Sequence, residues 1–320
     1  MKIIFLICLL VIANSFKFSS KKPKKITKTR AVKSKIVDSK GTINDALKVI
    51  KDSEINLKEI LPFKVSAAAE KGVKELVTEM SKYKQDPWHS GDLLEHSQWA
   101  AYSVLDWLKN PSTYPMVEGL DHSTLLVTTF FHDLGKAGDC IYNVYDKTKY
   151  GGKEDTIHPY YSGDYVLRKR KFMAAPCKGH TLNIPKIIKS IDPKIDIREV
   201  GFCSYMHWEF GKINAGWSKT SFALPVPKPL ISDYYKKVKE FIPMVGDRLK
   251  PSKELIKLCI AVACADVAGS RNIRLKADHP HILPENRNKT QDPWIDYKLE
   301  ANYKEIRNAV LNNYDDEMKR

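Results

Sequence analysis

Apolar residues recur at helical spacing along most of this chain after residue 41. Six segments place apolar side chains three and four positions apart: 44–60, 65–83, 92–109, 123–134, 252–268 and 294–311. Another helix is expected to begin at His158, whereas segments that alternate apolar and polar residues are scarce. The pattern predicts an all-α fold. We expect a loop over 139–156, and short helices with long irregular loops over 176–230, where several Pro and Gly fall.

The segment 123–134 is apolar almost all round, which is typical of a helix that is buried on every side. Its end nevertheless carries His132 and Asp133. Two other apolar helices also bear a residue of this kind: His96 lies on the apolar face of 92–109, and Asp266 points with the apolar residues of 252–268. Because burial of an unpaired carboxylate is costly, these positions require an explanation.

A divalent cation would remove that cost, because divalent metals bind neutral imidazole and carboxylate together. Taken singly, each residue has an ordinary interpretation, either as a hydrogen-bonded core histidine or as an acid that is solvated or pairs with Lys or Arg. The combination favours a shared site more strongly, since one His, an adjacent His-Asp pair and a distant Asp all fall on strongly apolar helices. The sequence therefore predicts a metal site built from His96, His132, Asp133 and Asp266.

The N-terminus has the features of a secretory signal. Lys2 precedes an apolar run over 3–13, and small residues at Ala13 and Ser15 suit cleavage after residue 15. This run is about half as long as a membrane-spanning helix needs to be, and no later stretch approaches such a span. We predict a signal peptide over 1–15 and a protein of the secretory pathway. The alternatives are an uncleaved anchor or a chance apolar start in a cytoplasmic protein.

The formal net charge of +15 is concentrated close to the N-terminus. Residues 16–40 hold ten Lys or Arg and one acid without an apolar period, which predicts a basic disordered linker. Residues 41–320 are only mildly basic, which argues against a nucleic-acid partner. The six cysteines form no C-x-x-C pair, and their spacing does not suggest a dense disulfide framework. Cys259 and Cys264 are expected to be buried thiols.

Three motifs resemble the HD superfamily of metal-dependent phosphohydrolases. The run FFHDLGK over 130–136 is similar to the signature of that family. The run LLEHS around His96 resembles its first metal-binding histidine, and the run CAD ending at Asp266 resembles its distal aspartate. The resemblance spans about residues 88–270, within an HD-type helical domain predicted over 41–320. It implies a helical HD-domain bundle in which His96, His132, Asp133 and Asp266 bind one divalent ion.

Some members of this family bind a second ion through further histidines. His158, in the run IHPYYSG, and His207, in the run MHWEFG, resemble the segments that carry them. Their ordinary interpretations are an imidazole at a helix start and an imidazole in an aromatic cluster. Trp208 stands where the cyclic-dinucleotide branch usually has another His, and that branch's Gly-Tyr-Pro run is missing, which argues against membership of the branch. The expected cofactor is one or two divalent ions, of Fe, Mn, Zn or Mg.

The resemblance implies hydrolysis of a small phosphate ester, of the nucleotide or cyclic nucleotide class, by metal-activated hydroxide. Asp133 could bridge two ions, and Lys136 could contact the phosphate or protonate the leaving oxygen, unless it is a solvated lysine at a helix end. Arg271 and Arg274 could clamp a phosphate, and His89 could line the pocket. The alternative function is a non-catalytic module that keeps the metal and binds a phosphorylated ligand or partner.

Overall fold

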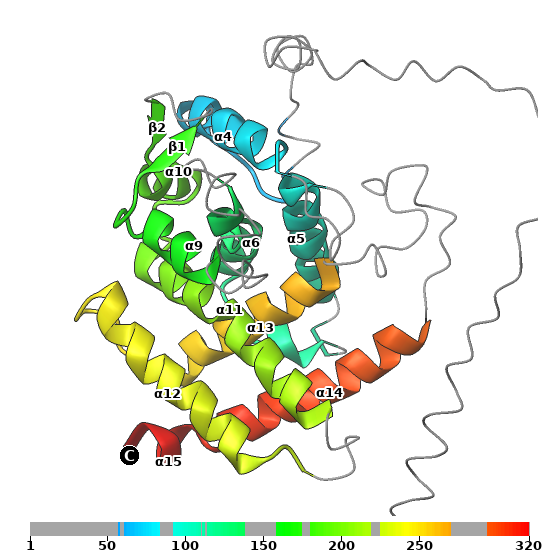
Figure 1. Cartoon of the computed structure of the whole chain (residues 1–320). Helices are drawn as coiled ribbons and strands as arrows, with labels where there is room; N and C mark the ends of the chain where they lie inside the picture. Colours follow the sequence, from blue (N-terminus) through cyan, green and yellow to red (C-terminus); the bar gives the residue numbers. More distant parts are fainter. Residues whose placement is uncertain are drawn as a thin grey trace, which may run out of the picture. The chain divides into compact units, whose positions relative to one another are not determined.

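The computed structural model describes most of the chain from residue 57 onward. The described parts are Leu57 and residues 61–83, 92–109, 111–112, 114–137, 158–174, 180–218, 225–269 and 293–319. Within them the fold is all-α, as the apolar pattern predicts (Figure 1). The two described strands are β1 (Phe172–Ala174) and β2 (His180–Leu182), which pair antiparallel with Phe172 opposite Leu182.

Several predictions fall outside the described residues. They are the signal peptide, the basic linker, most of the helix over 44–60 and the loop over 139–156. None of the described helices combines the length and the apolarity that crossing a membrane requires.

Five of the expected helices are present close to their predicted bounds: α4 (Ala67–Met80), α5 (Leu93–Lys109), α9 (His158–Val166), α13 (Lys253–Gly269) and α14 (Pro293–Asn312). Side-chain caps explain where two of them begin. The Asp92 carboxylate accepts a hydrogen bond of 2.9 Å from the Glu95 amide, so Asp92 caps the start of α5. The Ser252 hydroxyl accepts one of 3.1 Å from the Leu255 amide at the start of α13.

The central apolar helix, α6 (His122–Phe131), ends earlier than the pattern predicts. It is capped at its start by the Asp121 side chain, and all its residues from Leu125 to Phe131 are buried. His132 and Asp133 then form a turn that leads into a short 3-10 helix, η2 (Leu134–Lys136). Neighbouring residues in a regular helix point about 100° apart. His132 keeps helical backbone angles (φ −60°, ψ −29°), whereas Asp133 departs from them (φ −105°, ψ 13°), so the regular helical direction is lost at Asp133.

The expectation of only short helices and long loops over 176–230 is wrong. Instead, α10 (Ile184–Ile191) is followed by the 22-residue helix α11 (Ile197–Ser218) and then by α12 (Lys228–Val245), which the sequence did not indicate. Three glycines weaken α11, each by about 1 kcal/mol relative to alanine. Burial outweighs this deficit, because α11 inserts a row of large side chains into the core: Phe202, Tyr205, Met206, Phe210, Ile213 and Trp217.

The helices surround two apolar clusters that meet at α5 and α6. One cluster lies among α11, α12, α13 and α14, and the other lies among α4, α9, α10 and the strands. Both α5 and α6 contribute residues to each cluster, and α6 contacts α5, α11 and α13. In Figure 1, α11 lies beside α9, α12 and α13. Two short helices, η1 (Pro115–Val117) and α15 (Tyr314–Lys319), complete the described elements.

Removal of one aromatic ring tests this packing. Phe210 is buried on α11 and stacks on Tyr303 of α14, with ring centroids 5.5 Å apart. Phe210→Ala should lower the free energy of unfolding by about 3–5 kcal/mol, because it leaves a cavity between the two helices. Urea denaturation measures the change. The exposed Lys236→Ala on α12 is the control and should change stability by less than about 0.5 kcal/mol. A loss below about 1 kcal/mol in Phe210→Ala would contradict the α11–α14 packing.

Candidate metal centre

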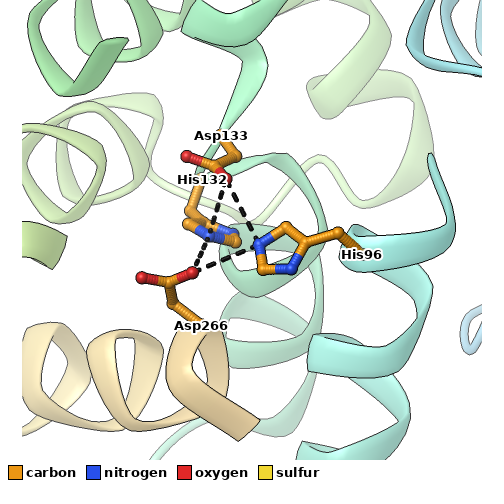
Figure 2. A group of neighbouring side chains, drawn as sticks. All are labelled: His96, His132, Asp133 and Asp266. Carbon is orange, nitrogen blue, oxygen red and sulfur yellow. Dashed lines mark ion pairs between the residues drawn. The ribbon is translucent and has the colours of Figure 1, made fainter. Parts of the chain in front are cut away.

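Four of the predicted ligands converge at one point in the core. His96 comes from α5, Asp266 from α13, and His132 and Asp133 from the turn after α6; in Figure 2 their side chains point toward one another. The His96 Nε2 atom lies 3.2 Å from both Asp133 Oδ2 and Asp266 Oδ1. The His132 Nε2 atom lies 3.6 Å and 3.4 Å from the same two oxygens. All four donor atoms therefore lie within 4.8 Å of one another.

These spacings suit a small divalent ion. Ligand atoms about 2.1 Å from a metal stand about 3.4 Å apart in tetrahedral geometry and about 3.0 Å apart in octahedral geometry. The four contacts between imidazole nitrogens and carboxylate oxygens span 3.2–3.6 Å. His96, His132 and Asp133 are almost fully buried, while the Asp266 side chain keeps 21% of its surface exposed. Of the four side chains, that of Asp266 is the most exposed.

A second group of donors lies against the other oxygen of Asp133. The Asp133 Oδ1 atom is 3.1 Å from His158 Nε2 and 3.4 Å from His207 Nε2, and the two Nε2 atoms are 3.1 Å apart. His158 is the first residue of α9, and His207 lies in the middle of α11. The two oxygens of one carboxylate therefore face two different groups of imidazoles. Both of these groups could hold a metal ion.

Backbone hydrogen bonds fix the tautomers of two of these histidines. The His132 Nδ1–H donates to the Thr129 carbonyl at 2.6 Å, and the His207 Nδ1–H donates to the Ser204 carbonyl at 2.7 Å. In the neutral form, each ring therefore turns an Nε2 lone pair toward the carboxylate of Asp133. Lone pairs that face carboxylate oxygens repel one another, so the arrangement calls for a cation between them. A backbone carbonyl on the second ring nitrogen is also the usual support of a metal-binding histidine.

Lys136 is part of the site and not a solvated lysine at a helix end. Its side chain is buried, and its Nζ lies 2.6 Å from Asp133 Oδ2. Burial by itself raises the pKa of Asp133, but the positive charge of Lys136 and the adjacent imidazoles outweigh burial and hold that pKa well below its usual range. Asp133 is therefore ionised at neutral pH, and the protein encloses its charge instead of neutralising it with a proton.

The other ionisable side chains of the site differ in charge at neutral pH. Burial lowers the pKa of His96, but the carboxylates of Asp133 and Asp266 outweigh burial and raise it to about 9. Burial raises the pKa of Asp266, and the imidazoles of His132 and His96 reverse that effect and hold it well below its usual range. For His158, burial prevails over the attraction of Asp133 and lowers the pKa to about 4. His158 is therefore a neutral imidazole at pH 7, as a metal ligand must be.

Two glycines allow the helices that carry these residues to approach closely. A Cβ atom on Gly135 would lie 2.0 Å from the His158 carbonyl oxygen, and the Gly135 amide donates to Ser162 Oγ at 2.7 Å. A Cβ atom on Gly269 would lie 2.9 Å from the His96 carbonyl oxygen. The first approach joins η2 to α9, and the second joins α13 to α5. Each of these close approaches brings a predicted ligand toward the candidate metal centre.

Trp208 is a neighbour of the site whose contact the sequence did not reveal. Its ring stacks on the His158 imidazole, with centroids 5.6 Å apart and planes at 26°. The Thr129 and Ser204 carbonyls were equally unforeseen, although each lies three residues before the histidine that it orients. The predicted substrate-binding residues, His89, Arg271 and Arg274, lie outside the described part of the chain.

No family model, curated protein or solved structure matches this chain. The site is therefore interpreted from its own residues. Its buried His/Asp groups could hold a metal ion. Imidazole with carboxylate suits several divalent transition metals, so the donor set does not select one of them.

Substitution of Gly135 tests the close approach. Gly135→Ala should lower the free energy of unfolding by about 2 kcal/mol or more and weaken metal binding, because the added methyl group collides with the backbone of α9. Gly211→Ala is the matched control, since its Cβ would meet nothing closer than a Trp208 ring atom at 3.8 Å. We expect the control to be neutral or to stabilise α11 by up to about 1 kcal/mol. Equal changes in the free energy of unfolding for the two substitutions, measured by urea denaturation, would contradict the close approach of η2 to α9.

The pKa of His96 predicts how metal binding depends on pH. Below pH 9 the imidazole of the metal-free protein is protonated, so a metal ion has to displace that proton. Affinity for Mn²⁺ should therefore rise about tenfold per pH unit between pH 7 and pH 8. Calorimetric titration in two buffers of different ionisation enthalpy should show release of about one proton per ion bound at this group. An affinity that stays constant over this range would be inconsistent with a protonated His96.

Proposed function

We propose that this chain is a metal-dependent phosphohydrolase of the HD superfamily. The observation that carries the proposal is the position of Asp133, whose two oxygens face two separate groups of imidazole nitrogens at 3.1–3.6 Å. The residues that supply these nitrogens are His96 and His132 on one side and His158 and His207 on the other. Asp266 completes the first group. All six are residues that the family resemblance marks as ligands.

The charge of the site supports an anionic substrate. With His96 deprotonated, as a metal ligand must be, Asp133 and Asp266 contribute two negative charges and Lys136 contributes one positive charge. One bound divalent ion reverses the sign of this sum, and a second ion makes the site strongly positive. A positive, partly enclosed site attracts phosphate groups and concentrates them from solution. The partly exposed Asp266 marks the side from which a small substrate could enter.

Different residues of the site would have different roles in the reaction. Asp133 and the four histidines would be ligands of the ions. The Thr129 and Ser204 carbonyls hold two of the imidazole rings in place. Bound divalent ions supply Lewis acidity, which makes water a better nucleophile at neutral pH and offsets charge on the phosphate. Lys136 is within reach of the same space, because its Nζ already contacts Asp133 Oδ2. From there the ammonium group could donate to a phosphate oxygen or protonate the leaving oxygen.

Metal content and phosphate release, measured together, test the proposal. The wild-type protein should hold one or two divalent ions per chain. With added Mn²⁺ or Fe²⁺ it should release phosphate from phosphomonoesters or open cyclic nucleotides to nucleoside monophosphates, measured over a panel of both. Asp133→Asn keeps the shape of the side chain but removes its charge. It should lower metal content, and it should lower phosphate release by at least about 100-fold. Lys136→Met should keep the metal and lower kcat.

Asp233→Asn provides the matched control, because Asp233 is exposed on α12. It should match the wild type in metal content and in rate. Metal that binds to the wild type without hydrolysis of any substrate in the panel would favour the non-catalytic module that binds a phosphorylated ligand. Absence of metal from both the wild type and Asp133→Asn, with no activity after metal addition, would overturn the proposal.

A further inference from the structure

Two buried cysteines lie against each other between two helices that carry candidate metal ligands. Cys203 on α11 and Cys259 on α13 place their Sγ atoms 3.0 Å apart, and each residue exposes 1% of its surface or less. This separation is only about 1 Å longer than a disulfide bond. Both residues are free thiols in the structure. The helices that carry them pack side by side, so the backbone does not have to move far for the sulfurs to bond.

Sequence separation made this pair hard to foresee. Cys203 and Cys259 are 56 residues apart, and they meet only because α11 and α13 pack together. A cross-link that closes so long a loop removes much of the conformational freedom of the unfolded chain, which is how a disulfide stabilises a fold. Cys264, the other described cysteine of α13, is also buried and provides an internal comparison.

We propose that Cys203 and Cys259 form a disulfide bond when the chain folds in an oxidising environment. The oxidant is a small disulfide, such as oxidised glutathione. The thiolate of one cysteine attacks it and forms a mixed disulfide, and one glutathione thiol leaves. The second cysteine, as its thiolate, attacks the protein sulfur of that mixed disulfide and displaces the other glutathione thiol. Two protein thiols thus lose two electrons and two protons, and one molecule of oxidised glutathione becomes two thiols.

The bond forms during folding, as α11 and α13 come together and before the sulfurs are sealed from solvent. Both sulfurs are inaccessible in the folded protein, and burial, with Cys259 close by, raises the pKa of the Cys203 thiol well above its usual value. A buried thiol of this kind is a poor nucleophile. The same burial protects the finished disulfide from reductants. It is therefore a structural cross-link and not a switch that opens and closes in the folded protein.

The cross-link would fix the distance between two helices of the metal centre. His207 lies one turn beyond Cys203 on α11, and Asp266 lies two turns beyond Cys259 on α13. One of these residues belongs to each group of candidate ligands. The inference does not depend on the proposed hydrolase activity, because it rests on the sulfur geometry alone.

Peptide mapping of the full chain tests the proposal. The protein is unfolded under reducing conditions, refolded either in a glutathione redox buffer or in dithiothreitol, alkylated in denaturant and digested with trypsin. Refolding with glutathione should link the peptide 199–212, which contains Cys203, to the peptide 258–271. The second peptide holds both Cys259 and Cys264. Fragment-ion spectra of the wild type, together with the map of Cys264→Ala, assign the bonded sulfur.

Thermal unfolding gives an independent readout. Protein refolded with glutathione should melt at least about 5 °C above protein refolded in dithiothreitol. The difference should persist in Cys264→Ala and vanish in Cys203→Ala. Full alkylation of Cys203 and Cys259 in glutathione-refolded protein would overturn the proposal, as would a bond from Cys264 to either of them. The wild-type peptide map decides the question even if Cys203→Ala does not fold.

Discussion

The burial of one ionised carboxylate is the constraint on which the rest of this structure depends. Asp133 exposes only 1% of its surface, yet the charges around it hold its pKa well below the usual range, so it stays ionised inside the core. Such a charge is tolerated only where positive partners surround it. In the metal-free protein Lys136 and the protonated His96 supply positive charge, whereas His132 and His207 turn lone pairs toward the carboxylate. A divalent cation would satisfy all of these groups at once.

The packing of the helices brings side chains together around this carboxylate. Five helices or turns deliver side chains to it, and they come from residues 96–266 of the chain. The turn after α6 takes Asp133 out of helical geometry, and Gly135 and Gly269 let the neighbouring helices approach to backbone contact. The sulfurs of Cys203 and Cys259 meet where α11 packs on α13. If they bond, they add a covalent constraint where packing already holds both groups of ligands.

The apolar periodicity predicted the all-α fold class. It did not predict α11, where the local composition favours loops. The helices α5 and α13 have unbroken apolar stripes, and their bounds follow from those stripes and from caps at Asp92 and Ser252. The helix α11 contains three glycines and lies in a region rich in proline, which local propensity assigns to loops. Its stability comes from side chains such as Phe210 and Trp217, which are buried against helices distant in the sequence. Helix propensity depends on residue type and local sequence, so it does not reflect burial against distant helices.

By itself, the sequence determined which residue types stand where apolar helices should exclude them, and this was enough to select His96, His132, Asp133 and Asp266 as one group. Family resemblance added His158 and His207 as candidates. Only the tertiary structure decided that each oxygen of Asp133 faces its own pair of imidazoles, that Lys136 is buried beside them, and that two cysteines 56 residues apart touch. The physical reason is that periodicity fixes the face of a helix on which a side chain lies. The distance between two faces depends on packing between helices that are remote in the sequence.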